Sequence, residues 1–162
     1  MIRAMTAADA NDVLAIYAYG LSTRNATFET RCPDWAEWDR RHHPFCRLVF
    51  EQNGRVAGWA ALSPMSQRVC YRGVAEISVY VAGDCSGRKI GSRLLDNAID
   101  VSEDNGIWTL FASVFPENEA TLRLHLGRGF RRLGVRERIA QLDGVWRDTV
   151  ILERRSTKVG AD

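Results

Sequence analysis

The stretch VAEISVYVAGDCSGRKIGSRLL, Val74 to Leu95, decides the fold because it contains a strand, a turn and the start of a helix in immediate succession. Apolar and polar residues alternate from Val74 to Val81, as in a strand with one buried face. The two expected faces carry Ile77, Val79 and Val81 on one side, and Glu76, Ser78 and Tyr80 on the other. From Ile90 onward, apolar residues recur at helical spacing. The stretch therefore predicts a strand that passes through a short turn into a helix.

The turn contains two glycines, Gly87 and Gly91, and two adjacent cations, Arg88 and Lys89. The first amides of a helix have no intrahelical partner and lie at the positive end of the helix dipole. Small residues and cations at such a place suit a pyrophosphate. The alternative is a plain basic turn, because strand-to-helix connections commonly carry small residues. Neither G-x-x-x-x-G-K-[ST] nor G-x-G-x-x-G is present, so the turn alone does not decide between the two.

Local signals on either side predict a mixture of strands, helices and hairpins. Strands are expected at 2–5, 45–51, 55–62, 108–115, 130–139 and 145–153, and helices after the capping pair Thr6 and Asp9, from Pro33-Asp34 to Pro44, and from 117 to 128 before Gly129. Asn53-Gly54 and Asp143-Gly144 are typical of tight hairpin turns. The pattern predicts one α/β (α+β) domain over residues 1–154 with a mainly antiparallel sheet. Residues 155–162 are expected to form a polar, frayed tail.

Composition excludes several classes of protein. Of 162 residues, 46% are hydrophobic and 26% charged, and the net charge of +2 is too small to indicate nucleic acid or an anionic membrane as the main partner. No apolar run approaches the length of a membrane helix, and the amino terminus lacks the pattern of a secretory signal. The four cysteines are widely spaced, which favours reduced thiols over a zinc site or a disulfide framework. We therefore expect a cytoplasmic protein with no metal ion.

Several segments, taken in order, resemble the GCN5-related N-acetyltransferase (GNAT) superfamily. They are AEISVYV, SGRKIGSRLL and PENEATLRLHLGRGF. AIYAYGLSTRNATFE, VAGWAALSP, CYRGVAEISVYV and LDGVWRDTVILER are similar to the phosphinothricin acetyltransferase branch, and FPEN, RHHPF and GVxERxxQLDGxWRD to its arsinothricin N-acetyltransferase subgroup. The resemblance extends from about residue 2 to 154. It implies a mixed, mostly antiparallel sheet of six to seven strands flanked by about four helices, and acetyl-CoA as co-substrate.

The resemblance implies that the basic turn binds the pyrophosphate of acetyl-CoA and that residues near the turn contact the rest of this co-substrate. The implied acetyl-CoA contacts are Val79, Tyr80, Val81, Ser86, Gly87, Arg88, Lys89, Ile90, Gly91, Ser92 and Asn118. Two positions depart from the family pattern [QR]-x-x-G-x-[GA]: Ser86 replaces Gln or Arg, and Lys89 replaces the central Gly. If the backbone at Lys89 needs a positive φ, its side chain adds strain of roughly 1 kcal/mol, which its charge near the phosphates could offset.

Two residues are predicted to handle protons. Acetyl transfer to an amine requires loss of the ammonium proton and protonation of the leaving thiolate. Glu76 matches the family's catalytic glutamate; the alternative is an exposed strand glutamate in a salt bridge. His125 stands where most of the superfamily has a tyrosine, and an imidazole can give or take a proton near neutral pH. The alternative for His125 is a packing role near Gly129. For Asn118, the alternative to binding acetyl-CoA is a position at the start of a helix with no role in binding.

The family builds its acceptor pocket from the segment after the first helix and from the approach to Glu76. The corresponding residues here are Phe28, Glu29, Arg68, Tyr71 and Arg72. Arginine binds a carboxylate, phosphinate or arsinate with two parallel hydrogen bonds, so Arg68 and Arg72 are candidate anchors, although either could be a solvated surface charge.

The leading interpretation is an acetyl-CoA-dependent N-acetyltransferase that detoxifies a small amino-acid analogue by acetylating its α-amine. The implied substrate class contains phosphinothricin, methionine sulfoximine or sulfone, and arsinothricin. The alternatives are acetylation of a protein N-terminus or a polyamine, and a non-catalytic acetyl-CoA-binding homologue. A homodimer is also expected, because this branch commonly dimerises and a small core does not readily hide five tryptophans.

Overall fold

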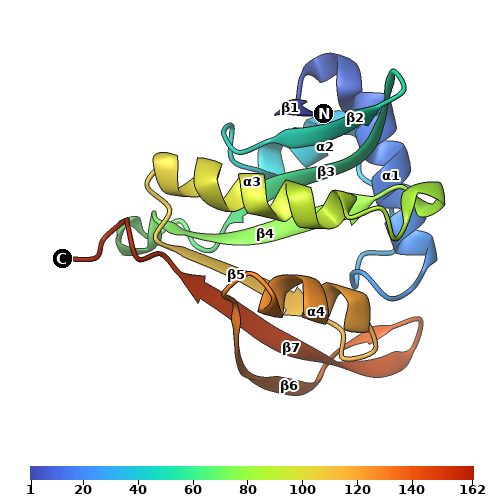
Figure 1. Ribbon diagram of the computed structural model, residues 1–162. Coiled ribbons are helices and arrows are strands. Elements are labelled where there is room, and N and C mark those ends of the chain that lie inside the picture. The colour runs from blue at the N-terminus through green and yellow to red at the C-terminus, as the bar shows by residue number, and fades with distance from the viewer.

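The computed structural model, which describes residues 1–162, is built on a seven-stranded sheet (Figure 1). The strands are β1 Ile2–Ala4, β2 Leu48–Gln52, β3 Arg55–Pro64, β4 Val74–Val81, β5 Thr109–Val114, β6 Arg131–Leu142 and β7 Val145–Arg155. Their order in the sheet is β1-β2-β3-β4-β5-β7-β6, and only β4 and β5 pair in parallel. The predicted mixed, mostly antiparallel sheet is confirmed.

Both predicted hairpin turns are present. Asn53 and Gly54 have φ angles of 53° and 75°, and Asp143 and Gly144 have φ angles of 51° and 80°. Two successive residues with positive φ give the turn whose twist matches that of the flanking strands, and Asn-Gly and Asp-Gly adopt it at low cost. These turns fix the β2–β3 and β6–β7 registers.

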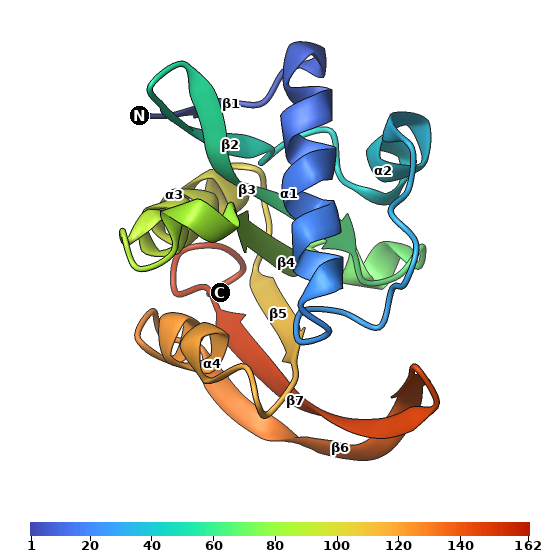
Figure 2. The same cartoon turned by 90° about the vertical axis from the view of Figure 1, so that its right-hand side faces the viewer.

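Two pairs of helices cover opposite faces of the sheet (Figure 2). Helices α1 Ala10–Ser22 and α2 Trp35–Arg41 lie on one face, and α3 Ile90–Asp104 and α4 Glu119–Leu126 on the other. Three short 3-10 turns, η1 Ala7–Asp9, η2 Val69–Tyr71 and η3 Gly83–Cys85, join these elements. None of the helices combines the length and the apolar composition that a bilayer crossing requires.

The alternation predicted for β4 divides the core into two clusters. Ile77, with Val79 and Val81 against it, belongs to the large cluster on the α3 side, whereas Tyr80 packs against the smaller cluster around Trp38 and Trp59. Helix α4 is shorter than the expected 117–128. The Asn118 side chain caps it by accepting from the Thr121 amide at 3.2 Å, and Gly127 forms its carboxyl-terminal cap.

The start of the carboxyl-terminal tail is held against the domain at Ser156, whereas residues 160–162 at its end are exposed. Ser156 is 5% exposed, and its hydroxyl donates to the Glu103 carboxylate at 2.9 Å. The same carboxylate binds Arg154 at 2.9 Å and Lys158 at 3.0 Å. The acid lies 53 residues before Ser156, on the last turn of α3, and so no local signal reveals it.

The sheet opens between β4 and β5. These strands share only three register positions, of which Glu76↔Phe111 is the last. On its other edge, β4 stays paired with β3 from Ala75 to Val81. Strand β5 instead turns away with β7, which it pairs as far as Val114↔Val150. One edge of β4 from Ile77 to Val81 is therefore free of strand partners.

Candidate active site

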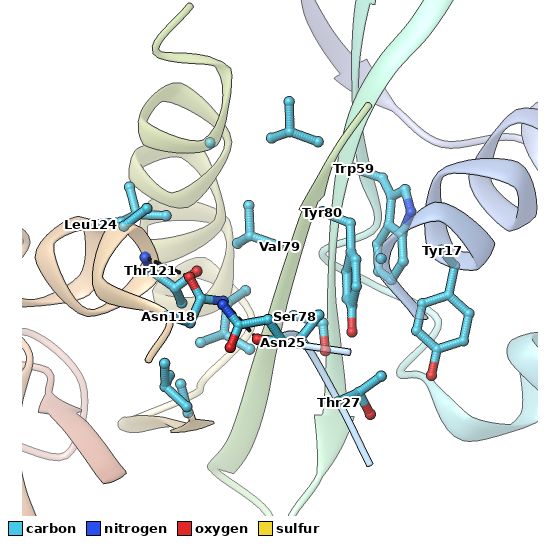
Figure 3. Close-up of a pocket in the computed structure, with 18 of the residues that line it drawn as sticks. Tyr17, Asn25, Thr27, Trp59, Ser78, Val79, Tyr80, Asn118, Thr121 and Leu124 are labelled. Atoms are coloured by element: carbon cyan, nitrogen blue, oxygen red, sulfur yellow. Dashed lines mark hydrogen bonds between the residues drawn. The ribbon is translucent and has the colours of Figure 1, made fainter. Parts of the chain in front are cut away.

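A cleft of about 980 Å³ follows this opening. One end is formed by the turn before α3, the middle by the free edge of β4 and by α4, and the other end by α1, α2 and the segment between them. Figure 3 shows Val79 projecting from β4 toward α4, and Tyr80 projecting toward Trp59 and Tyr17. The cleft thus connects the predicted pyrophosphate turn with the predicted acceptor pocket.

The turn end of the cleft is lined with free amides. None of the backbone N–H groups from Gly87 to Ser92 donates to an acceptor in the chain, and α3 has no side-chain cap; its first backbone bond runs from Arg93 to the Lys89 carbonyl. Six consecutive donors at the positive end of a 15-residue helix form a site for an anion.

Lys89 is the amino-terminal cap of α3 and has a left-handed backbone with φ of 60°. This is the condition under which its side chain costs roughly 1 kcal/mol relative to glycine. The backbone therefore adopts the form that the family's central glycine permits, and an exposed ammonium group lies on the anion site as well.

In the middle of the cleft, the Asn118 side chain uses both ends of its amide. Its oxygen caps α4, and its nitrogen donates to the Asn25 carbonyl at 3.0 Å (Figure 3). This second bond ties the segment after α1 to α4 across the cleft. Phe28 packs edge-on against Phe115 beside it, with 4.9 Å between ring centroids.

Glu76 lies where β4 and β5 separate, with its side chain in the cleft. The carboxylate has no hydrogen-bond or ion-pair partner within 4 Å, and Ser63 is its cross-strand neighbour on β3. Burial raises its pKa, and the charge of Arg136 opposes that shift. A carboxylate with few partners and a raised pKa is suited to accept a proton from a bound group.

His125 lines the cleft but is only 2% exposed. Its Nδ1 lies 2.9 Å from the Thr121 carbonyl, its Nε2 has no hydrogen-bond partner, and its ring meets Phe130 edge-on. Burial lowers its pKa, which favours the neutral ring. The carbonyl fixes the proton on Nδ1, so Nε2 carries a lone pair and can accept a proton.

Tyr80 forms part of the opposite wall. Its ring stacks on Trp59 at 4.8 Å and meets Tyr17 edge-on at 5.1 Å. Gly20 permits this packing, because a Cβ there would lie 2.6 Å from Tyr80 Cε1. Burial raises the pKa of Tyr80 strongly, so its hydroxyl stays protonated and can donate a hydrogen bond into the cleft.

The structure brings most of the predicted site residues together. Besides Glu76 and His125, the cleft is lined by Val79, Tyr80, Val81, Ser86, Gly87, Lys89, Ile90, Gly91, Ser92, Asn118, Phe28 and Glu29. Arg88 is exposed on the turn and is not part of the lining.

Three predicted acceptor residues do not reach the cleft. Arg68, Tyr71 and Arg72 are exposed around η2. The Arg68 guanidinium lies over the Tyr71 ring at 5.4 Å, and that of Arg72 lies over the Trp108 ring at 5.3 Å. In this structure, neither arginine has the cleft contact that an anchor for the acceptor needs.

Sequence reasoning missed other lining residues, among them Tyr17 and Arg41. Tyr17 reads as part of the apolar stripe of α1, and Arg41 is one of two adjacent arginines at the end of α2. The sequence indicates which residues are helical there, but contacts between α2 and the rest of the chain decide which arginine faces the cleft.

A sheet that separates beside an anion-binding helix start can take a long phosphorylated ligand along its free strand edge. A proton-accepting carboxylate at the point of separation suits group transfer to an amine. The chain is accordingly an enzyme of the acyltransferase class. It belongs to the Acetyltransferase (GNAT) family, whose profile matches residues 15–130.

Two similar proteins are named as acetyltransferases of amino-acid analogues. The chain is 34% identical to the phosphinothricin N-acetyltransferase of Alcaligenes faecalis over 94% of this chain and 81% of the relative. It is 29% identical to the L-methionine sulfoximine/L-methionine sulfone acetyltransferase of Pseudomonas aeruginosa, over 94% and 92%.

Two solved structures have nearly the same fold. A phosphinothricin acetyltransferase from Sinorhizobium meliloti in complex with AcCoA has a TM-score of 0.91 at 26% identity, with 100% of this chain and 91% of the other covered. The ribosomal-protein-alanine N-acetyltransferase from Brucella melitensis has a TM-score of 0.89 at 30% identity, with 96% and 99% covered. The phosphinothricin acetyltransferase-like character of the chain is confirmed.

Proposed function

We propose that this protein transfers the acetyl group of acetyl-CoA to the α-amine of a small amino-acid analogue of the phosphinothricin, methionine sulfoximine or sulfone, or arsinothricin type. One observation carries the proposal: the free amides of Gly87 to Ser92 open into the same cleft as the Glu76 carboxylate. This arrangement supports a phosphorylated donor at one end and an amine at the other.

The residues present fit acetyl-CoA. The amides from Gly87 to Ser92 would hold its pyrophosphate, with Lys89 and Arg88 adding charge. The free edge of β4 from Ile77 to Val81 would pair with the pantetheine arm as an added strand does. Asn118 would bind that arm only by sharing or giving up its bond to Asn25. When bound, acetyl-CoA supplies the thioester whose acetyl group is transferred.

Glu76 is the proposed general base, directly or through a water molecule. An amino acid reaches the cleft as an ammonium ion and must lose a proton before its nitrogen can attack a carbonyl. Because its pKa is raised, Glu76 has a proton affinity closer to that of the amine than an exposed glutamate has.

His125 is proposed to take part in the same proton transfer. The free protein presents an Nε2 lone pair, so His125 first accepts a proton there and can protonate a leaving thiolate only afterwards. We propose that the proton His125 accepts is the one that Glu76 removes from the amine.

One alternative acceptor has support of its own. Similarity to the ribosomal-protein-alanine N-acetyltransferase favours a protein amino terminus as a second candidate. A non-catalytic acetyl-CoA-binding protein is the remaining alternative.

The free thiols of all four cysteines fit a reducing compartment, which supports action in the cytoplasm.

We also propose a homodimer, on different grounds from those expected. Trp38 and Trp59 are 1% exposed and only Trp146 is half-exposed, so tryptophan content is a weak argument. Strand β6 is an edge strand with no partner beyond β7. Apolar side chains on β6 and the start of β7 are 47% to 60% exposed: Leu133, Val135, Ile139, Val145 and Trp146. Such an edge suits a second copy. Light scattering that finds only monomer at micromolar concentration would contradict this.

The function is tested by measuring CoA thiol release with a panel of amines: phosphinothricin, methionine sulfone, methionine sulfoximine, arsinothricin, spermidine and a peptide that begins with alanine. We expect turnover with the amino-acid analogues. Acetyl-CoA should also raise the melting temperature, because it binds only the folded protein. A thermal shift without any turnover would favour the non-catalytic alternative, and turnover confined to the peptide would favour the second candidate.

A further inference from the structure

Cationic side chains in the cleft fall into two groups, those that make hydrogen bonds within the chain and those that make none. Arg123 pairs with Glu119 at 3.1 Å, and Arg128 donates to Asp96 at 2.7 Å and to two backbone carbonyls. Arg41 and Lys89 also line the cleft, and neither makes a hydrogen bond through its side chain. Lys89 lies at the pyrophosphate turn. Arg41 ends α2, at the acceptor end of the cleft.

Glu37, one turn earlier on α2, also feels the charge of Arg41 but is paired with Arg31 at 2.8 Å. The acid that pairs with the Arg41 guanidinium is Glu29. Its Oε1 lies 3.9 Å from Arg41 Nη1, beyond hydrogen-bonding distance, and both side chains are about half-exposed, at 52% and 47%. The Glu29 carboxylate accepts no hydrogen bond from the chain either. An exposed pair at this distance contributes little to stability, so the five donors of Arg41 remain available to a ligand.

The surroundings of Arg41 form a small polar site on an aromatic wall. Burial raises the pKa of Tyr17, the Glu29 charge raises it further, and a Thr27 hydrogen bond and the Arg41 charge oppose these effects. Tyr17 meets Tyr80 edge-on at 5.1 Å, and Tyr80 in turn feels the charges of Glu76 and Glu29. Arg41, the two tyrosines and the proposed base Glu76 therefore line one continuous cleft.

We propose that Arg41 binds the carboxylate of the acceptor and so selects α-amino acids over amines that lack an acid group. This inference rests on the proposed function, and it moves the anchor from Arg68 and Arg72 to a residue of α2. A guanidinium binds a carboxylate through two parallel hydrogen bonds, which fixes the orientation of the acceptor and directs its amine. A carboxylate bound by Arg41 would leave the rest of the acceptor in the cleft that Tyr17, Tyr80 and Glu76 also line.

The test compares Arg41→Gln with the matched control Arg40→Gln. Both arginines are in the last turn of α2, and Arg40 is exposed, does not line the cleft and has no ion pair. The two variants thus change net charge and helix equally. The acceptors are L-methionine sulfone and its carboxamide, which differ only in the group that Arg41 would bind. Retained acetyl-CoA binding, seen as a thermal shift, establishes that each variant is folded.

We expect Arg41→Gln to raise KM for the carboxylate acceptor by roughly 10- to 100-fold, the range for losing a hydrogen bond to a charged group. Its KM for the carboxamide should change less than about threefold, and Arg40→Gln should alter neither. Arg41→Lys should be intermediate, because it keeps the charge and loses the fork.

Equal effects of Arg41→Gln on both acceptors would overturn the inference, as would a carboxylate-specific rise in KM caused by Arg68→Gln instead. In both cases the wild-type protein still acetylates amines, and the proposed function stands. A folded wild-type protein that releases no CoA with any acceptor would overturn both.

Discussion

Glu76 and Phe111 occupy the last register position that β4 and β5 share, and beyond this pair the two strands separate. The same strand therefore supplies the proposed base and, from the next residue to its end at Val81, the free edge that leads to the anion-binding turn. Any ligand held by that turn and that edge has its far end beside the carboxylate. A one-residue slip of β4 would turn Glu76 to the opposite face of the sheet.

Replacing Glu76 with glutamine should leave acetyl-CoA binding intact and lower turnover at neutral pH by roughly 10²- to 10⁴-fold, the range for loss of a general base. Turnover of Glu76→Gln should partly recover as pH rises, because more acceptor then arrives as free amine. In the wild-type protein, kcat/KM should fall on acidification through a pKa above the usual range of glutamate, since burial raises the pKa of Glu76.

The control for this variant is Glu137→Gln, at an exposed position on β6. It should behave as wild type in steady-state assays across the pH range. Wild-type turnover by Glu76→Gln at neutral pH would remove Glu76 from the mechanism.

His125→Asn should separate the structural and chemical roles of the imidazole. An asparagine amide can still donate to the Thr121 carbonyl, as Nδ1 does, but it lacks the lone pair at Nε2. We expect thermal stability near that of wild type and a lower kcat, with a smaller loss than for Glu76→Gln. The Glu76→Gln, His125→Asn double variant should lose less than the sum of the two single losses if both groups serve one proton path. Additive losses would indicate independent roles.

Lys89→Gly and Lys89→Gln should distinguish strain from charge at the pyrophosphate turn. Glycine relieves the positive φ, a gain of roughly 1 kcal/mol that the added freedom of the unfolded chain partly cancels. Glutamine keeps the strain and removes the charge. Calorimetric titration with acetyl-CoA should therefore show weaker binding in Lys89→Gln, with an affinity for Lys89→Gly at or above that of Lys89→Gln. Unchanged affinity in both variants would exclude Lys89 from phosphate binding.

Glu103→Gln should destabilise the protein in a pH-dependent way. Burial raises the pKa of Glu103, but hydrogen bonds from Arg154, Lys158 and Ser156 outweigh that effect and lower it to about 2. A folded-state pKa below the unfolded value of about 4.3 gives stability that is present near neutral pH and lost on acidification. Urea unfolding should show Glu103→Gln less stable by about 1–3 kcal/mol at pH 7, and by roughly half of that at pH 3. A deficit independent of pH would indicate a packing effect alone.

Local signals in the sequence were sufficient for most of the elements. The alternation in β4, the capping pair Thr6 and Asp9, the helix start at Asp34, and the turns at Asn53 and Asp143 each depend on residues a few positions apart. Their propensities agree with the final structure, so they could be read without knowledge of the fold. The end of α4, which was predicted too late, depends instead on the cap at Gly127. The position of the tail after Arg155 depends on one distant acid, Glu103.

The sequence by itself determined the sheet, the basic turn at the start of α3 and the identity of the two candidate proton carriers. Only the tertiary structure decided that β5 leaves β4 at Glu76, that Thr121 fixes the proton of His125 on Nδ1, and that Arg41 faces the cleft while Arg68 and Arg72 remain outside. The physical reason is the distance along the chain over which each kind of interaction acts. Backbone propensity acts over a few residues, whereas the partners of a cleft side chain come from segments far apart in the chain and are set only when helices pack on the sheet.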